Sequence, residues 1–283
     1  MNIIQFVVCL LAIVSLSSQG KNFTVNSETF EVTKLNKQLY VASQSYGNTR
    51  INFGIVVGEH KIALISSMMR NYAPTIEQLI KHISRKPIGY VISIDSDPFH
   101  HHANQYFAEA GAITIGHQGL QSEYPLMLTY KDEMIINLGN ETLRLVHTSA
   151  HTAGHSAVMV SNSNAIFVGD GIRNDWLMYS GENGPKAQLK GLQTMLSLAD
   201  DNTHFYPGNR GQKISSSKAE LTQLKDRYQE FVQLVTELYQ QGLSAEQICA
   251  APEMFKIVRH YERYEELHPY LIHHVNEVLD SLK

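Results

Sequence analysis

The chain has 283 residues, of which 43% are hydrophobic and 18% are charged, so it can bury a sizeable core as one large globular domain, with or without a small appendage. This composition excludes an intrinsically disordered protein. The formal net charge of −4, with mixed signs along the chain, gives no sustained basic surface and argues against binding to nucleic acid or to an anionic membrane. We expect a small-molecule substrate or ligand, or a protein, as the partner.

The chain begins with an apolar segment from Ile3 to Ser18, which is followed by Gln19 and Gly20. The segment is short for a membrane span and ends in small residues suited to cleavage. We therefore interpret residues 1–20 as a signal peptide and expect an exported protein, periplasmic or secreted. An uncleaved N-terminal anchor is the alternative, because the usual Lys or Arg before the apolar run is missing. Removal of the peptide leaves Cys249 as the single cysteine, which excludes an internal disulfide.

Short β-rich runs separated by polar residues predict a meander of strands, followed by strand and helix in alternation. The predicted strands of the meander are 30–35, 39–42, 51–57 and 62–65. Helical spacing then appears at Ile76, Leu79, Ile80 and Ile83, before a buried type of strand at 90–94. A helix at 103–110 ends at Gly111, and the later predicted strands are 113–115, 134–138, 143–147, 157–160 and 165–168. Two mixed sheets packed together, with helices on their outer faces, would bury such a series as an α+β fold.

The C-terminal part of the chain predicts helices. Ser217 and Glu220 form a capping box that opens a helix with one apolar face, made of Leu221, Leu224, Tyr228, Phe231, Val235 and Leu238. Gly242 ends this helix, a second capping box starts at Ser244, and further helices are predicted within 254–264 and 270–282. We divide the mature chain into a domain at 21–212 and a helical extension at 213–283 that packs on it.

Four predicted strand ends carry side chains that could bind a divalent cation. The loops are Asp95-Ser96-Asp97-Pro98-Phe99-His100, His151-Thr152-Ala153-Gly154-His155, Gly169-Asp170 and Tyr206-Pro207-Gly208-Asn209. Their order, together with the segment from Asn104 to Ala112, resembles the metallo-β-lactamase superfamily of hydrolases over roughly residues 30–210. This resemblance implies a four-layer αββα sandwich.

The resemblance also shows that the metal-binding motif of that family is degenerate in this chain. The family's first loop reads His-x-His-x-Asp-His, and here Asp95 and Asp97 stand at the two leading His positions, Phe99 at the Asp position and His100 at the last His. His151 matches the ligand of the second loop and Asp170 the bridging carboxylate, whereas Asn209 replaces a His. Ser66 replaces an Asp that commonly ends an early strand, which predicts the loss of a supporting contact.

These substitutions predict one divalent ion rather than two. Phe99 cannot coordinate a cation and Asn209 offers only a neutral amide, so the second metal position of the family is expected to be weak or empty. Asp95, Asp97, His151 and Asp170, with His100 as a further candidate, form a ligand set rich in oxygen, which shifts preference from zinc toward manganese, iron or magnesium. We expect zinc, manganese or iron, and a metal-free protein is the alternative because Asp is shorter than His.

Two functions follow from these residues. The first is a divergent exported hydrolase in which one metal activates water and Asp97 or Asp170 orients that water. The second is a non-catalytic protein that keeps the fold and binds a ligand or a protein, a pseudoenzyme. Fold resemblance cannot choose among lactams, thioesters, lactones and phosphoesters as substrates.

Several other residues have simpler interpretations. His101 and His102 extend His100 into a run at the start of a helix, where neighbouring side chains diverge, so both are expected at the surface or in packing. His155 is expected to form structural hydrogen bonds. For the stretch from Trp176 to Tyr179 two alternatives stay open, a substrate pocket or packing against the C-terminal helices.

Overall fold

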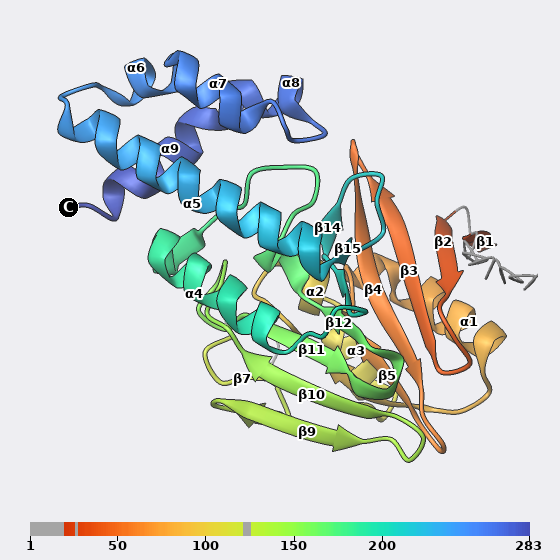
Figure 1. The fold of residues 1–283 in the computed structure, drawn as a ribbon. Coiled ribbons are helices and arrows are strands. Elements are labelled where there is room, and N and C mark those ends of the chain that lie inside the picture. The colour runs from red at the N-terminus through yellow and green to blue at the C-terminus, as the bar shows by residue number, and fades with distance from the viewer. Residues whose placement is uncertain (1–19, 26–27, 121–125) are drawn as a thin grey trace, which may run out of the picture.

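The structure is a computed structural model that describes residues 20–25, 28–120 and 126–283. The predicted signal peptide lies outside the described residues except for Gly20. Two β-sheets pack face to face and helices cover their outer faces, which gives four layers (Figure 1). The predicted α+β sandwich is confirmed.

The first sheet has nine described strands and comes mostly from the N-terminal half of the chain. Its central strand β4 has six consecutive buried residues, because both of its faces are covered, and its β-branched and aromatic side chains suit that environment. The strands lie in the order β1 (Lys21–Val25), β2 (Glu28–Lys34), β3 (Leu39–Tyr46), β4 (Thr49–Val57), β5 (Ile62–Ile65), β6 (Ile88–Ile92), β7 (Ile113–His117) and β8 (Leu128–Tyr130), and β14 (Asn209–Arg210) pairs with β4.

The second sheet has six described strands from the later part of the chain. Its strands lie in the order β15 (Ser216–Ser217), β13 (His204–Tyr206), β12 (Ala165–Phe167), β11 (Ser156–Val160), β10 (Thr142–His147) and β9 (Glu133–Asn137). Because β14 follows β13 directly but pairs with β4, the chain crosses from the second sheet to the first at Pro207 and Gly208.

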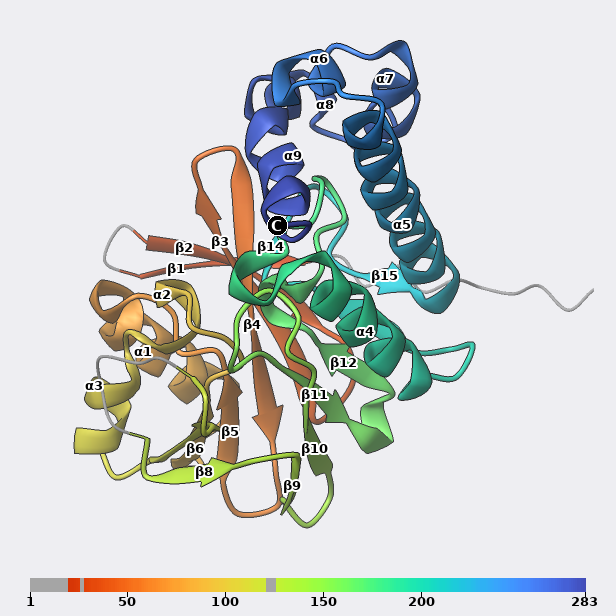
Figure 2. The same ribbon diagram turned by 90° about the vertical axis from the view of Figure 1, so that its left-hand side faces the viewer.

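Helices α1 and α3 lie on one side of the two sheets, and α4 and α5 lie on the other (Figure 2). Ser217 caps α5 through the predicted box with Glu220, and Ser244 caps α6 in the same way. The helices are α1 (Ala73–Ile83), α2 (Pro98–His101), α3 (Asn104–Glu109), α4 (Gly184–Ser197), α5 (Lys218–Gln240), α6 (Ala245–Cys249), α7 (Pro252–Val258), α8 (Tyr264–Leu267) and α9 (Leu271–Asp280).

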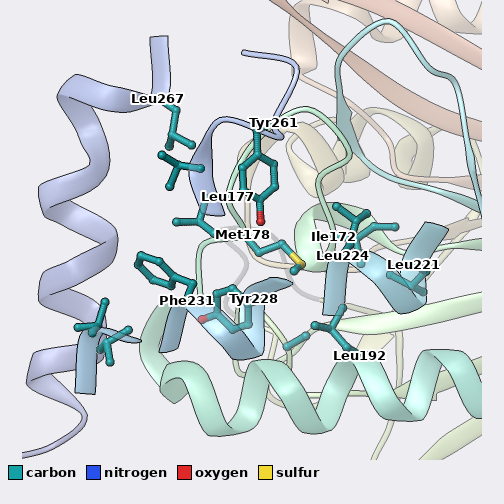
Figure 3. Packing of buried hydrophobic residues seen from close by; sticks show 14 of the residues in the cluster. Ile172, Leu177, Met178, Leu192, Leu221, Leu224, Tyr228, Phe231, Tyr261 and Leu267 are labelled. Atoms are coloured by element: carbon teal, nitrogen blue, oxygen red, sulfur yellow. The ribbon is translucent and has the colours of Figure 1, made fainter. Parts of the chain in front are cut away.

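Three apolar clusters fill the spaces between the layers. One lies between the sheets and another between the first sheet and α1 and α3. The third joins the second sheet to α4 and to the C-terminal helices, and Figure 3 shows Leu192 of α4 and Tyr228 and Phe231 of α5 pointing into it. The C-terminal helices are therefore part of the same continuous core as the second sheet.

The structure contains elements that the sequence did not predict, and most of them, except for α4, are short. The sequence did not predict β1, β8, β13 to β15 or α4, and the helix expected within 254–264 is interrupted between α7 and α8. Among residues 20–25, 28–120 and 126–283, no helix is both long and apolar enough to cross a membrane. The boundary between residues 212 and 213 stays a prediction.

Candidate metal centre

A buried group of two carboxylates and one imidazole lies at the ends of β6 and β12. His100, in α2, points its Nε2 atom at Asp95 Oδ2 and at Asp170 Oδ1, each 3.5 Å away. Asp95 and His100 are fully buried and Asp170 is 9% exposed. Neither His100 Nε2 nor Asp170 Oδ1 has a hydrogen-bond partner. We call Asp95, His100 and Asp170 the inner group.

The backbone holds the carboxylate of Asp95 in place from two loops. Asp95 Oδ1 accepts a hydrogen bond from the Asp97 amide, and Oδ2 accepts one from the Asp170 amide, both at 3.0 Å. Asp95 is thus both a turn-forming residue and the link between the loop after β6 and the loop after β12. Each carboxylate oxygen has a second lone pair, so these bonds leave Asp95 able to coordinate a cation.

A second group, which we call the outer group, contains Asp97, His151 and again Asp170. His151 Nε2 lies 3.0 Å from Asp97 Oδ2, and His151 Nδ1 lies 3.3 Å from the carbonyl oxygen of Tyr179. The Asp97 side chain is 39% exposed and that of His151 is 9% exposed, so this group faces the solvent. In each group the three potential ligand atoms lie within 4.8 Å of one another, and Asp170 is shared.

The charges of the two groups are strongly coupled. Burial disfavours the charged form of His100, but the carboxylates of Asp95 and Asp170 overcome it and raise the pKa of His100 to about 9. The pKa of His151 rises to about 9 as well, because the bond with Asp97 and the charge of Asp95 outweigh burial. In the metal-free state both imidazoles therefore carry a proton at pH 7. Burial raises the pKa of Asp95, whereas His100 holds the pKa of Asp170 below its usual range despite burial.

The crossing between the sheets closes one side of the inner group. A side chain on Gly208 would lie 2.4 Å from His100 Cε1 and 2.8 Å from Asp170 Oδ1, so only glycine fits at this position. The next residue, Asn209, is oriented differently, because its side-chain oxygen accepts a hydrogen bond from Thr49. Asn209 therefore supports the pairing of β14 with β4.

One expectation from the sequence is wrong. Ser66 does not leave the site without support, since its Oγ atom lies 2.8 Å from His100 Nδ1 and fixes the ring orientation. The five predicted ligands divide into two groups that share Asp170, because the Asp95 side chain turns to His100 and Asp170 and not to His151. Phe99 contacts Tyr46 at a ring distance of 4.7 Å and packs beside the core of the first sheet.

The other histidines near these loops, and the stretch from Trp176 to Tyr179, lie in hydrogen-bonded or packed positions outside the two groups. His101 is buried, with its Nε2 atom 2.9 Å from the Ser96 carbonyl oxygen, and His102 is half-buried. His155 is fully buried between Thr148 and the Val168 carbonyl. In the stretch from Trp176 to Tyr179, Leu177 and Met178 pack against the C-terminal helices, while Tyr179 is 50% exposed beside His151. Packing against the C-terminal helices is thus confirmed for Leu177 and Met178, and the substrate pocket stays a prediction.

Sequence reasoning missed the polar residues that surround His151. Gln188 of α4 is fully buried and accepts a hydrogen bond from the His151 amide. Glu277 of α9 accepts bonds from the amide and the hydroxyl of Ser180, next to Tyr179. The sequence does contain a signal for α4, which is the helical spacing of Leu189, Leu192, Met195 and Leu196. Gln188 lies on the same face of that helix, and a polar residue among apolar ones would have marked it as a candidate.

Solved structures resemble the fold of this protein over most of the chain. A metallo-β-lactamase from Pontibacter korlensis superposes with a TM-score of 0.64 at 13% identity, covering 71% of this chain and 99% of its own. The chain has the metallo-β-lactamase fold. The DIM-1 metallo-β-lactamase (TM-score 0.62, 16% identity, 71% of this chain and 97% of its own) and IND-7 (0.62, 15%, 72% and 100%) agree. No family model and no curated protein sequence matches the chain.

In both groups of this chain, carboxylate donors outnumber imidazole donors. Each group provides one imidazole nitrogen and carboxylate oxygens from two Asp residues. Such mixed sets suit zinc, manganese and iron. The unpartnered His100 Nε2 and Asp170 Oδ1 atoms, which face each other in a buried position, fit a cation between them, because a buried polar atom without a partner is costly.

Proposed function

We propose that this protein is a metal-dependent hydrolase that acts on a small molecule through one divalent ion in the inner group. The observation that carries the proposal is the pair of unpartnered atoms, His100 Nε2 and Asp170 Oδ1. Their separation of 3.5 Å is too long for a charge-assisted hydrogen bond, which is typically about 2.7–2.9 Å. In the outer group, by contrast, His151 and Asp97 already satisfy each other at 3.0 Å.

In this proposal Asp95, His100 and Asp170 hold the ion. When bound, the ion would lower the pKa of water and polarise the carbonyl or phosphoryl group of a substrate. Ser66 orients the His100 ring, and backbone amides fix the Asp95 carboxylate. Asp97 is the partly exposed carboxylate of the site, so it is placed to accept a proton from water, and the His151 imidazolium holds it in position.

Metal analysis tests this proposal. The purified protein, without a polyhistidine tag, is dialysed and its metals are measured by inductively coupled plasma mass spectrometry. We expect about one ion per chain, which is lost in His100→Ala and kept in His60→Ala, whose imidazole is exposed at the surface. Zinc, manganese or iron would agree with the donor set. Wild-type protein that stays metal-free after incubation with each of these ions contradicts the proposal.

A non-catalytic binding protein is the second candidate. The hydrogen bond from Thr49 to Asn209 favours this candidate. The family resemblance places a metal ligand at position 209, but here the side chain supports strand pairing instead. Phe99 likewise stands at a ligand position and packs against Tyr46. Tight binding of a small molecule or protein to the metal-free chain, without turnover, would support this candidate. Metal-dependent hydrolysis that Asp97→Asn abolishes would exclude it.

We also propose that the protein is exported. The support is the apolar run from Ile3 to Ser18 and the small residues that precede Lys21. N-terminal sequencing of protein recovered from the expressing cells tests this, since cleavage near Gly20 gives a new first residue. An intact N-terminus in the membrane fraction would favour an anchor instead. The substrate class and the oligomeric state need direct screening, and we expect no nucleic-acid partner because the charge is mixed.

A further inference from the structure

The side chain of Gln188, in α4, is hydrogen-bonded to two loops of the candidate metal centre. Its Oε1 atom accepts a hydrogen bond from the His151 amide at 2.8 Å, and its Nε2 atom donates to the Gly171 carbonyl at 2.7 Å. Gly171 directly follows Asp170. The side chain of Gln188 therefore bridges the loop that carries His151 and the loop that carries Asp170.

The orientation of the Gln188 amide is determined by its surroundings. The His151 amide can only donate and the Gly171 carbonyl can only accept, so a flipped side chain would lose both bonds. Gln188 is fully buried, which means that no water can replace either bond at low cost. Both polar ends of this side chain are thus committed to the two loops.

His151 needs such a fixed partner because its backbone is strained. Its φ angle of 59° lies in the left-handed region, where a residue with a side chain persists only if its surroundings hold it. Gln188 fixes the backbone of His151, while Tyr179 and Asp97 fix the two ring nitrogens. On the other loop, the Asp170 amide is bound to Asp95.

We propose that Gln188 is a positioning residue of the metal centre, which sets the separation of His151 and Asp170 and so places the Asp170 ligand relative to the Asp97–His151 pair. This inference rests on the proposed function, in which Asp170 holds the ion and His151 holds Asp97 in position. Gln188 itself coordinates nothing. Removing a partner that orients a ligand typically lowers metal affinity about 10–100-fold.

The test compares Gln188→Met with Leu192→Ala. Methionine has a similar length and removes both hydrogen bonds, whereas Leu192 is a buried core residue one turn further along α4, with no bond to either loop. The thermal unfolding of each protein is followed without metal and with Zn²⁺ or Mn²⁺, and the affinity for each ion is measured by calorimetric titration. Binding of the ion to the folded state raises Tm in proportion to that affinity.

We expect both variants to unfold at a lower Tm than wild type without metal. Zn²⁺ or Mn²⁺ should then raise Tm as much in Leu192→Ala as in wild type, but clearly less in Gln188→Met, whose Kd should increase at least about tenfold. Equal affinity in Gln188→Met and Leu192→Ala would overturn the inference and leave the proposed function intact. If Gln188→Met does not fold, Gln188→Asn serves instead, because it is shorter by one methylene and cannot span both loops.

Hydrogen exchange in the metal-free protein keeps this inference separate from the proposed function. In wild type the His151 amide should exchange slowly, because it is bonded to a buried acceptor. Faster exchange at His151 and at 170–172 in Gln188→Met, but not in Leu192→Ala, supports the bridge even if wild type binds no ion. Unchanged exchange overturns it. A wild-type protein that binds neither ion contradicts the proposed function.

Discussion

His151 Nε2 and Asp97 Oδ2 lie 3.0 Å apart, with the imidazole buried and the carboxylate facing the solvent. This pair connects the loop after β6 to the loop after β10. Because the pair raises the pKa of His151 to about 9, the metal-free protein keeps an imidazolium at the mouth of the site at neutral pH.

The stability contributed by this pair should depend on pH. The pKa of His151 is higher in the folded chain than the ordinary 6.5, so the stabilisation is complete below pH 6.5 and is lost as pH rises through about 9. We expect Asp97→Asn to lower the free energy of unfolding by about 1 kcal/mol or less at pH 6, since the carboxylate is partly exposed, and by less at pH 10. Urea denaturation of metal-free protein measures this. Asp201→Asn, at an exposed carboxylate, should show no such pH dependence.

His155 should destabilise the protein in acid. Burial lowers the pKa of His155 to about 3, so between pH 6.5 and 3 the unfolded chain binds a proton there that the folded chain does not. Stability therefore falls as pH falls through this window. His155→Gln should cost about 1–3 kcal/mol at pH 8, where the bonds to Thr148 and Val168 are lost, and the difference from wild type should narrow toward pH 4. A difference that stays constant from pH 8 to pH 4 would contradict this account.

Gly181 should tolerate no side chain. Its φ angle is 59°, and a Cβ atom there would lie 1.6 Å from the His151 carbonyl oxygen. Gly47 is the matched control, because it has a φ angle of 55° and nothing within 4 Å of a Cβ atom. We expect Gly47→Ala to cost about 1 kcal/mol through backbone strain alone. Gly181→Ala should cost clearly more and weaken metal binding, as thermal unfolding and calorimetric titration can show; equal effects would contradict the close contact with His151.

The C-terminal helices should unfold together with the second sheet. Phe231 of α5 is buried in the cluster that joins them, so Phe231→Ala should lower the free energy of unfolding by about 3–5 kcal/mol. Phe255 of α7 is 48% exposed, and Phe255→Ala should have a much smaller effect. Chemical denaturation followed by far-UV circular dichroism and by Trp176 fluorescence should give one coincident transition. Two separate transitions would mean that the helices form an independent unit.

The sequence predicted the elements whose patterns are long or strongly capped. The predicted strand at 51–57 lies within β4, and the boxes at Ser217 and Ser244 open α5 and α6. The patterns were weakest where tertiary contacts decide the structure. β13, β14 and β15 have only two or three residues each, too few for a periodic signal, and they form because neighbouring strands supply their partners.

The candidate site shows the same limit. The sequence singled out Asp95, Asp97, His100, His151 and Asp170, and the structure brings all five together around the ends of β6, β10 and β12. The sequence could not indicate which carboxylate lies next to which imidazole. That depends on backbone hydrogen bonds such as the one from the Asp170 amide to Asp95. The roles of Ser66 and Gln188 also depend on contacts distant in the sequence.

The protonated His100 bears on the order in which the chain folds and binds its metal ion. Held between Asp95 and Asp170, the imidazolium supplies positive charge at the place where we propose that an ion binds. In the metal-free protein at neutral pH, this single positive charge offsets part of the negative charge of the two buried carboxylates. Folding can come first and loading later, with protons leaving as the ion enters.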